Sequence, residues 1–168
     1  MNVTFAFSYT NDVSPEYLRR LDAPCFSEQE LAQFDEQSQA NVRLQRTYID
    51  AHPAVAIFRC AAEGSQTRDG GVIQKGTAPL SFELEDGQTV RGACKGDYVL
   101  YVDGSTVPIL TGAGQGHNDL ALVGSLLGNG DQIINTPQGG FSFVMRDGVL
   151  MADDFLPSIV ESDGGEIQ

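Results

Sequence analysis

Hydrophobic and polar positions follow different patterns on the two sides of residue 55. Residues 27–51 contain few strand formers and carry a patchy apolar stripe at helical spacing, whose members are Leu31, Phe34, Val42, Leu44 and Tyr48. Ser27 followed by Glu30 has the spacing of a capping box, in which each side chain accepts a hydrogen bond from the other residue's backbone N–H. We therefore expect a helical region over residues 27–51, with its stripe packed against another element.

A shorter helix is expected over residues 15–21. Ser14 carries a hydroxyl that can cap the first turn, and Pro15 at the first helical position costs no intrahelical hydrogen bond. The two helical regions together predict a helical extension over residues 1–55.

Beyond residue 55 the chain consists of short runs rich in Val, Ile, Thr, Phe and Tyr, bounded by Gly, Asp and Asn. The expected strands are residues 55–61, 72–74, 80–84, 89–93, 98–102, 107–111, 119–123, 132–135 and 141–146. The 19 glycines of the chain favour many tight turns over long helices. The fold class is therefore expected to be mainly β, or α+β when the helical extension is included.

A degenerate repeat occurs three times in the β-rich part. Each copy contains a strand of small residues, a Gly-Ser or Gly-Asp corner, a tight glycine turn and a β-branched strand. The repeat glycines are Gly64 and Gly71, Gly96 and Gly104, and Gly124 and Gly130. Because one copy cannot bury an apolar face alone, three copies predict a pseudo-threefold β-structure.

Residues 58–138 resemble the PAAR-repeat family, whose segments combine Pro-Ala-Ala-Arg and Val-Gly-Asp with a turn carrying His or Cys and then Gly-Gly. The stretch 120–125, Leu-Ala-Leu-Val-Gly-Ser, is similar to Ala-Ala-Arg-Val-Gly-Asp. The stretch 64–73 is similar to the family's Gly-Asp to Gly-Gly segment, and Gly96-Asp97 keeps the Gly-Asp pair.

The resemblance implies a small β-cone over residues 56–146, followed by an acidic C-terminal tail over residues 147–168. Its implied function is non-catalytic: a tip that caps and sharpens the trimeric VgrG spike of a type VI secretion system or a phage baseplate, for membrane piercing and effector delivery. The extension over residues 1–55 would then carry or tether an effector or its adaptor.

The chain departs from the family at the zinc site near the apex. The residues aligned with the zinc ligands are Asp69, Tyr101, Asp103 and Asn129. Structural zinc favours thiolate and imidazole ligands, so we expect no zinc there. Hydrogen bonds from the Asp and Asn side chains to turn amides are expected instead. Oxygen-bound Ca²⁺ or Mg²⁺ is the less favoured alternative, and no other cofactor is expected.

Charge narrows the range of partners. The formal net charge of −13 disfavours binding to nucleic acid or to anionic membranes, and the sequence has neither an apolar membrane span nor the basic, apolar start of a secretory signal. We expect a soluble protein without a stable membrane anchor, cytoplasmic before the machine fires and exported only by it.

Other chemistry has weaker support in the sequence. The glycine loop over residues 112–116 lacks the third glycine of a dinucleotide fingerprint and precedes an expected strand. Cys25, Cys60 and Cys94 have no metal-binding spacing, and His52 and His117 stand apart from each other.

Two alternative functions remain open at this point. The first is a small toxin or hydrolase that uses His117 with Asp119 and a Cys or Ser. The second is an effector adaptor or chaperone that acts through residues 1–55 and the acidic tail.

Overall fold

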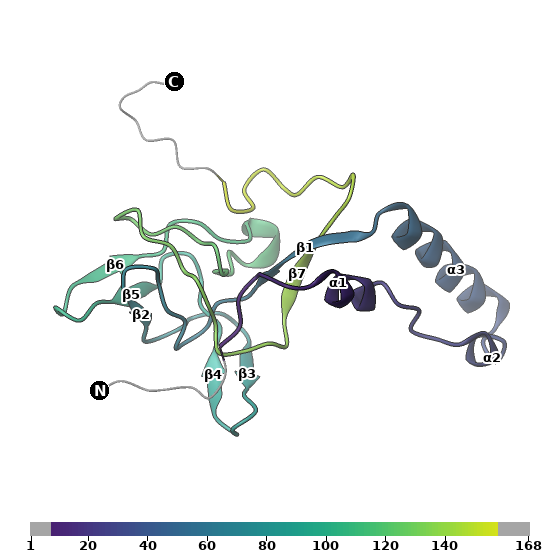
Figure 1. The fold of residues 1–168 in the computed structure, drawn as a ribbon, viewed down its shortest axis with the longest axis horizontal. Helices are drawn as coiled ribbons and strands as arrows, with labels where there is room; N and C mark the ends of the chain where they lie inside the picture. The colour runs from purple at the N-terminus through teal and green to yellow at the C-terminus, as the bar shows by residue number, and fades with distance from the viewer. Residues whose placement is uncertain (1–7, 158–168) are drawn as a thin grey trace. The chain divides into compact units, whose positions relative to one another are not determined.

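The structure is a computed structural model that describes residues 8–157 (Figure 1). The chain divides into two compact units. Of the described residues, 8–10, 59–142 and 152–157 form the first, here called the repeat unit, while 11–58 and 143–151 form the second, here called the helical unit. The expected boundary at residue 55 lies within a strand, since β1 spans Ala54–Arg59. The boundaries at 55 and 146 stay predictions.

The first helix of the helical unit, α1 (Pro15–Leu21), has the expected bounds. The Ser14 side chain accepts a hydrogen bond from the Tyr17 N–H at 3.0 Å. This hydrogen bond confirms the predicted cap. Sequence spacing could predict it because such a cap depends only on residues within one turn.

The helical region expected over residues 27–51 consists of two helices, α2 (Glu28–Leu31) and α3 (Glu36–Ala51). The Ser27–Glu30 capping box is confirmed. The interruption arises because Asp35 adopts an extended conformation and accepts from the Ser38 N–H at 2.7 Å, which starts a new helix.

The apolar stripe is packed only in part. Leu31 is buried, but Leu44 and Tyr48 are 70% and 46% exposed, and α3 contains no buried residue. The expectation that the whole stripe packs against another element is therefore wrong for α3.

A partly buried ion pair connects segments of the helical unit. Asp22, which follows α1, accepts from Arg146 at 2.8 Å and from the Ala54 N–H at 2.8 Å. Arg146 ends β7 (Ser142–Arg146), which pairs with β1. One carboxylate therefore connects the end of α1 to both strands of this sheet.

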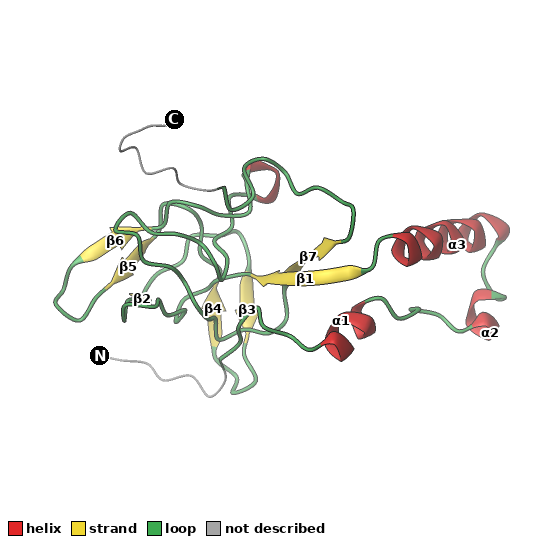
Figure 2. Cartoon of the chain, turned by 45° about the horizontal axis from the view of Figure 1, so that its top comes forward, coloured by secondary structure: helices red, strands yellow, loops and turns green. Residues whose placement is uncertain are grey.

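The described part of the repeat unit contains two further sheets (Figure 2). One is three-stranded, with β5 (Tyr98–Leu100) between β2 (Val72–Ile73) and β6 (Thr106–Pro108). The other pairs β3 (Ser81–Glu83) with β4 (Thr89–Arg91). With about 27% strand and 20% helix, the chain agrees with the expected mainly β class with added helix.

Two of the expected strands do not form as continuous strands. Residues 119–123 and 132–135 make single bridges instead, including Leu120 to Cys94, Leu122 to Cys60 and Ile133 to Thr67. Each bridge joins a single pair of residues, in most cases from two different copies of the repeat, which is too short for a continuous ladder.

The three copies of the repeat make the same local hydrogen bonds. In each copy the corner glycine donates its N–H to an isoleucine carbonyl, and the pairs are Gly64–Ile73, Gly96–Ile109 and Gly124–Ile133, at 2.9, 2.8 and 2.8 Å. All three glycines have positive φ, between 95° and 110°, which glycine adopts without steric cost.

The residue after each corner glycine uses its side-chain oxygen to accept the N–H three positions earlier. These pairs are Ser65 with Ala62, Asp97 with Cys94, and Ser125 with Leu122, at 3.0, 2.8 and 2.9 Å. A short side chain with an acceptor close to the backbone is needed here, which explains the Gly-Ser/Asp pattern.

The copies are joined by a cycle of backbone hydrogen bonds. The Ala61 N–H donates to the Ala121 carbonyl, the Ala121 N–H to the Ala93 carbonyl, and the Ala93 N–H to the Ala61 carbonyl, at 2.8, 2.8 and 3.0 Å. The three alanines are completely buried. The cluster that surrounds them comprises Ile73, Val99, Ile109, Leu127 and Ile133.

Pairings at the hairpins follow the same cyclic order. Ile73 lies opposite Val99, Ile109 opposite Leu127, and Ile133 opposite Thr67. Within this set Thr67 is the polar counterpart of Val99 and Leu127. Its hydroxyl belongs to the cluster of polar side chains described below.

Candidate functional site

Four polar residues from the three hairpins meet next to the buried cluster. We call Thr67, Tyr101, Asn129 and Asp131 the tip cluster. The Tyr101 hydroxyl donates to Oδ2 of Asp131 at 2.5 Å and accepts from Nδ2 of Asn129 at 3.2 Å. Each copy of the repeat contributes at least one member.

Two features of the hairpins bring Tyr101 into this position. The middle hairpin is longer than the others, because Ile109 follows Gly96 by 13 positions, whereas Ile73 follows Gly64 by 9. Tyr101 follows β5 in this extra length.

The second feature is the absence of a side chain at Gly71. A Cβ there would lie 2.3 Å from Cγ1 of Val99 and 2.9 Å from the Tyr101 ring. Gly71 thus provides space, whereas the turn position with positive φ in the first copy belongs to Gly70, as it does to Gly104 and Gly130 in the others. This corrects the expectation that Gly71 is the turn glycine.

The Asp131 side chain is completely buried and fully hydrogen bonded. Burial alone would raise the pKa of its carboxyl, but bonds from Thr67, Tyr101 and the backbone N–H groups of Gln132 and Asp69 hold that pKa below its usual range. Asp131 is therefore an ionised acceptor. Burial, and then the bond to Asp131, raises the pKa of the Tyr101 hydroxyl, so Tyr101 remains a donor.

Of the four residues aligned with the family's zinc ligands, the structure brings two together, Tyr101 and Asn129. Asp103 instead accepts from the Ser105 N–H at 2.9 Å within its own turn. The Asp69 carboxylate is 60% exposed and lies 3.6 Å from Arg68. The expected Asx-type bonds to turn amides are present for Asp103 and for Asn129, whose Oδ1 accepts from the Asp131 N–H at 3.0 Å.

Sequence reasoning missed Asp131, the centre of the tip cluster. The signal available was its place two residues after Asn129, directly behind the turn glycine. An acidic residue just before an expected strand has low strand propensity, which indicates that it has a partner.

The tip cluster does not fit zinc. It offers one carboxylate, one phenol, one hydroxyl and one amide, without a thiolate or imidazole. Both carboxylate oxygens already accept hydrogen bonds. Among residues 8–157, no group of three or more His, Cys, Asp or Glu side chains is arranged to hold a metal ion.

The nucleophile candidates are poorly activated. Burial raises the pKa of the Cys60 thiol to about 12, and burial together with the nearby Asp97 carboxylate raises the pKa of Cys94. A nucleophilic cysteine needs the opposite shift. His117 lies in the short η1 helix (Gln115–His117).

The glycine loop over residues 112–116 is occupied by the chain's own carboxylate. Oδ2 of Asp154 accepts from the Gln115 N–H at 2.9 Å, and a Cβ at Gly114 would collide with the same side chain. Phe155 is buried, and the Leu156 N–H donates to the Gly112 carbonyl at 2.8 Å. Residues 154–156 of the expected acidic tail are therefore docked, while residues 158–168 lie outside the described part.

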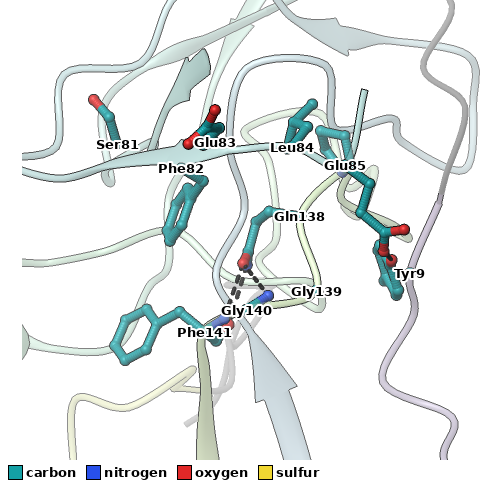
Figure 3. Close-up of a pocket in the computed structure, with 11 residues that line it drawn as sticks. Tyr9, Ser81, Phe82, Glu83, Leu84, Glu85, Gln138, Gly139, Gly140 and Phe141 are labelled. Atoms are coloured by element: carbon teal, nitrogen blue, oxygen red, sulfur yellow. Dashed lines mark hydrogen bonds between the residues drawn. The ribbon is translucent and has the colours of Figure 1, made fainter. Parts of the chain in front are cut away.

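A pocket of about 540 Å³, here called the β3 pocket, lies beside the β3–β4 hairpin (Figure 3). Residues 81–85 line one side and residues 137–141 the other, with Tyr9 at one end. The Phe82 and Phe141 rings stack with centroids 6.5 Å apart.

Tyr9 is held firmly at the end of the β3 pocket. Its hydroxyl donates to Oε2 of Glu85 at 2.7 Å, and the Arg59 guanidinium lies 5.2 Å from its ring centroid. A Cβ at Gly139 would lie 2.8 Å from the Tyr9 ring, so Gly139 allows this close approach. The bond to Glu85, and secondarily burial, raises the pKa of Tyr9.

Comparison with known proteins finds no matching family model, no matching curated protein and no matching solved structure. Within residues 8–157, no helix combines the length and the apolar character needed to cross a membrane. Functional conclusions therefore depend on the residues and their geometry.

Proposed function

We propose that this chain is a PAAR-like, non-catalytic tip protein that caps a trimeric VgrG-type spike of a contractile injection machine. The observation that supports the proposal is the cycle of hydrogen bonds among Ala61, Ala93 and Ala121, one from each copy of the repeat. A single chain with three equivalent faces can contact the three subunits of a trimer in the same way, which suits a threefold partner.

In this proposal the three hairpins form a pseudo-threefold β-cone, and the tip cluster closes its narrow end. The partly buried Tyr101–Asp131 hydrogen bond then takes the structural role that zinc has in the family. A fully satisfied network of this kind is rigid, because an ionised carboxylate with several donors resists rearrangement in a buried setting. Rigidity at the narrow end is what membrane piercing requires.

We further propose that the helical unit is the attachment point for an effector or its adaptor. The exposed Leu44 and Tyr48 lie one helical turn apart on α3, and His52 continues the stripe with its ring 4.8 Å from that of Tyr48. A helix with an uncovered apolar stripe is suited to pack against a partner.

The test mixes the purified chain with its cognate trimeric spike and measures the mass of the complex in solution. We expect one chain per spike trimer. The double variant Leu44→Ser and Tyr48→Ser serves as the matched control, because it changes α3 alone and should bind the spike equally well. A spike that never binds the folded chain would overturn the proposal.

A further inference from the structure

Among the described residues, one edge of the β3–β4 hairpin is hydrogen bonded to another segment and the other edge is not. Ser81, Phe82 and Glu83 lie opposite Arg91, Val90 and Thr89. On the outer side of β4, the Arg91 carbonyl accepts from the Glu63 N–H at 3.0 Å, and the Arg91 N–H donates to Oε1 of Glu63 at 3.0 Å. The β4 edge is therefore covered.

No other strand among residues 8–157 pairs with the outer edge of β3. The Leu84 N–H donates to Gln88 and the Leu80 carbonyl accepts from Gly92, so residues at even positions direct their backbone groups toward β4. Alternation in an antiparallel pair directs the N–H and C=O groups of Ser81 and Glu83 away from β4. Within the described residues these groups make no backbone hydrogen bond across this edge.

The opposite side of the β3 pocket is fixed in place (Figure 3). Oε1 of Gln138 accepts from the N–H groups of Gly140 and Phe141 at 2.8 and 2.9 Å, and its Nε2 donates to the Cys60 and Phe141 carbonyls at 2.8 and 3.0 Å. Because the side chain of Gln138 is buried and hydrogen bonded through both its oxygen and its nitrogen, this wall is preformed.

The lining of the β3 pocket is aromatic and acidic. Phe82, Phe141 and Tyr9 supply apolar surface, and the charged lining residues are Glu83 and Glu85, with no Lys or Arg among them. Glu85 is engaged by Tyr9, so Glu83 is the carboxylate available to a ligand. Electrostatic complementarity then selects a basic ligand.

From the open edge, the preformed wall and the acidic lining, we propose that the β3 pocket binds an extended, basic segment of a partner protein. The segment pairs with Ser81 and Glu83 as an added strand, places an apolar side chain against Phe82 and Phe141, and places a Lys or Arg beside Glu83. This site is independent of the spike-tip proposal, since it uses neither the tip cluster nor the cycle of alanines.

The test uses a short capped peptide in which Lys alternates with Val and Phe, and measures its binding to the full chain by calorimetric titration. We expect the peptide to bind and its affinity to fall with added salt. We also expect its affinity to fall when the backbone amides that would pair with β3 are N-methylated. A matched peptide with Glu in place of Lys should bind less well. Equal binding of the N-methylated peptide would overturn strand addition.

Charge exchange at Glu83 tests the position of the site. Glu83 is exposed, and Glu83→Lys should lower the affinity for the Lys peptide by about fivefold and raise the affinity for the Glu peptide. Asp153→Lys makes the same charge change outside the pocket lining and should leave both affinities unchanged. Equal effects of the two variants on peptide affinity would overturn the proposal. Peptide binding that appears only after residues 1–7 are deleted would also overturn it, because the chain's own segment would then be the occupant of the β3 pocket.

Discussion

The Tyr101 hydroxyl and the Asp131 carboxylate form a hydrogen bond of 2.5 Å between two different copies of the repeat. Because Asp131 is completely buried, this bond and its neighbours hold an ionised group inside the repeat unit. The fold therefore depends on this pair in ways that can be measured.

Tyr101→Phe removes the donor and keeps the ring. We expect the free energy of unfolding to fall by about 2 kcal/mol, because a buried charged acceptor loses one of its bonds. Urea unfolding checks this. Tyr98→Phe is the matched control, since Tyr98 is 59% exposed, and its change should be close to zero. Equal effects of the two substitutions would contradict the role given to Tyr101.

Acid should weaken the tip cluster. The pKa of Asp131 is lowered in the folded chain, so its ionised form stabilises the fold above the unfolded pKa of about 4, and that stability is lost as the pH falls through the folded pKa. Asp131→Asn should be less stable at pH 7 and should show a smaller loss of stability below pH 4. Parallel pH profiles for the two proteins would count against this assignment.

Chelators should leave the stability of the chain unchanged. The tip cluster lacks thiolate and imidazole ligands, so we expect the same melting temperature with EDTA, with added zinc and with neither. Elemental analysis of the purified chain is the second measurement. Zinc at one equivalent, lost together with stability on chelation, would show that this expectation is wrong.

Gly71→Ala should destabilise the chain by about 1–3 kcal/mol or more, because the new methyl group would collide with Val99 and Tyr101. Gly116→Ala is the matched control, since no atom lies within 4 Å of the added Cβ. Thermal unfolding of both variants decides the matter. A tolerated Gly71→Ala would mean that Tyr101 is not packed as described.

Arg146→Gln should destabilise the helical unit selectively. Burial would raise the pKa of Asp22, but the Ala54 N–H and Arg146 lower it overall. Removal of Arg146 leaves a largely buried carboxylate without its hydrogen-bonded cation. We expect a loss of about 2 kcal/mol, seen as faster amide exchange in residues 11–58. Arg19→Gln breaks only an exposed pair with Glu16 and should have no measurable effect.

Local features of the fold could be predicted from the sequence, whereas contacts between copies could not. The Ser14 cap and the Ser27–Glu30 box depend on residues within one turn, so sequence spacing determines them. The bridges at Leu120 and Leu122 depend on how separate copies meet. The pattern of strand-forming residues therefore predicted continuous strands where only isolated bridges form.

The tip cluster shows the same limit. The alignment with the zinc ligands of the PAAR family included Tyr101 and Asn129, which are hydrogen bonded to each other. It missed Asp131, whose importance arises only when Tyr101 from the longer middle hairpin reaches across to it. Helical spacing likewise placed Leu44 in an apolar stripe, but it did not show that this side chain is exposed on α3.

The cycle formed by Ala61, Ala93 and Ala121 has no first or last member. Each alanine is at once a donor to one neighbour and an acceptor from the other, so the loss of any copy breaks two of the three bonds. Unfolding should therefore be all-or-none across the three copies, without the fraying from an end that open repeat arrays show. A circular permutation that places the new chain termini in an exposed hairpin loop would leave this cycle of hydrogen bonds intact.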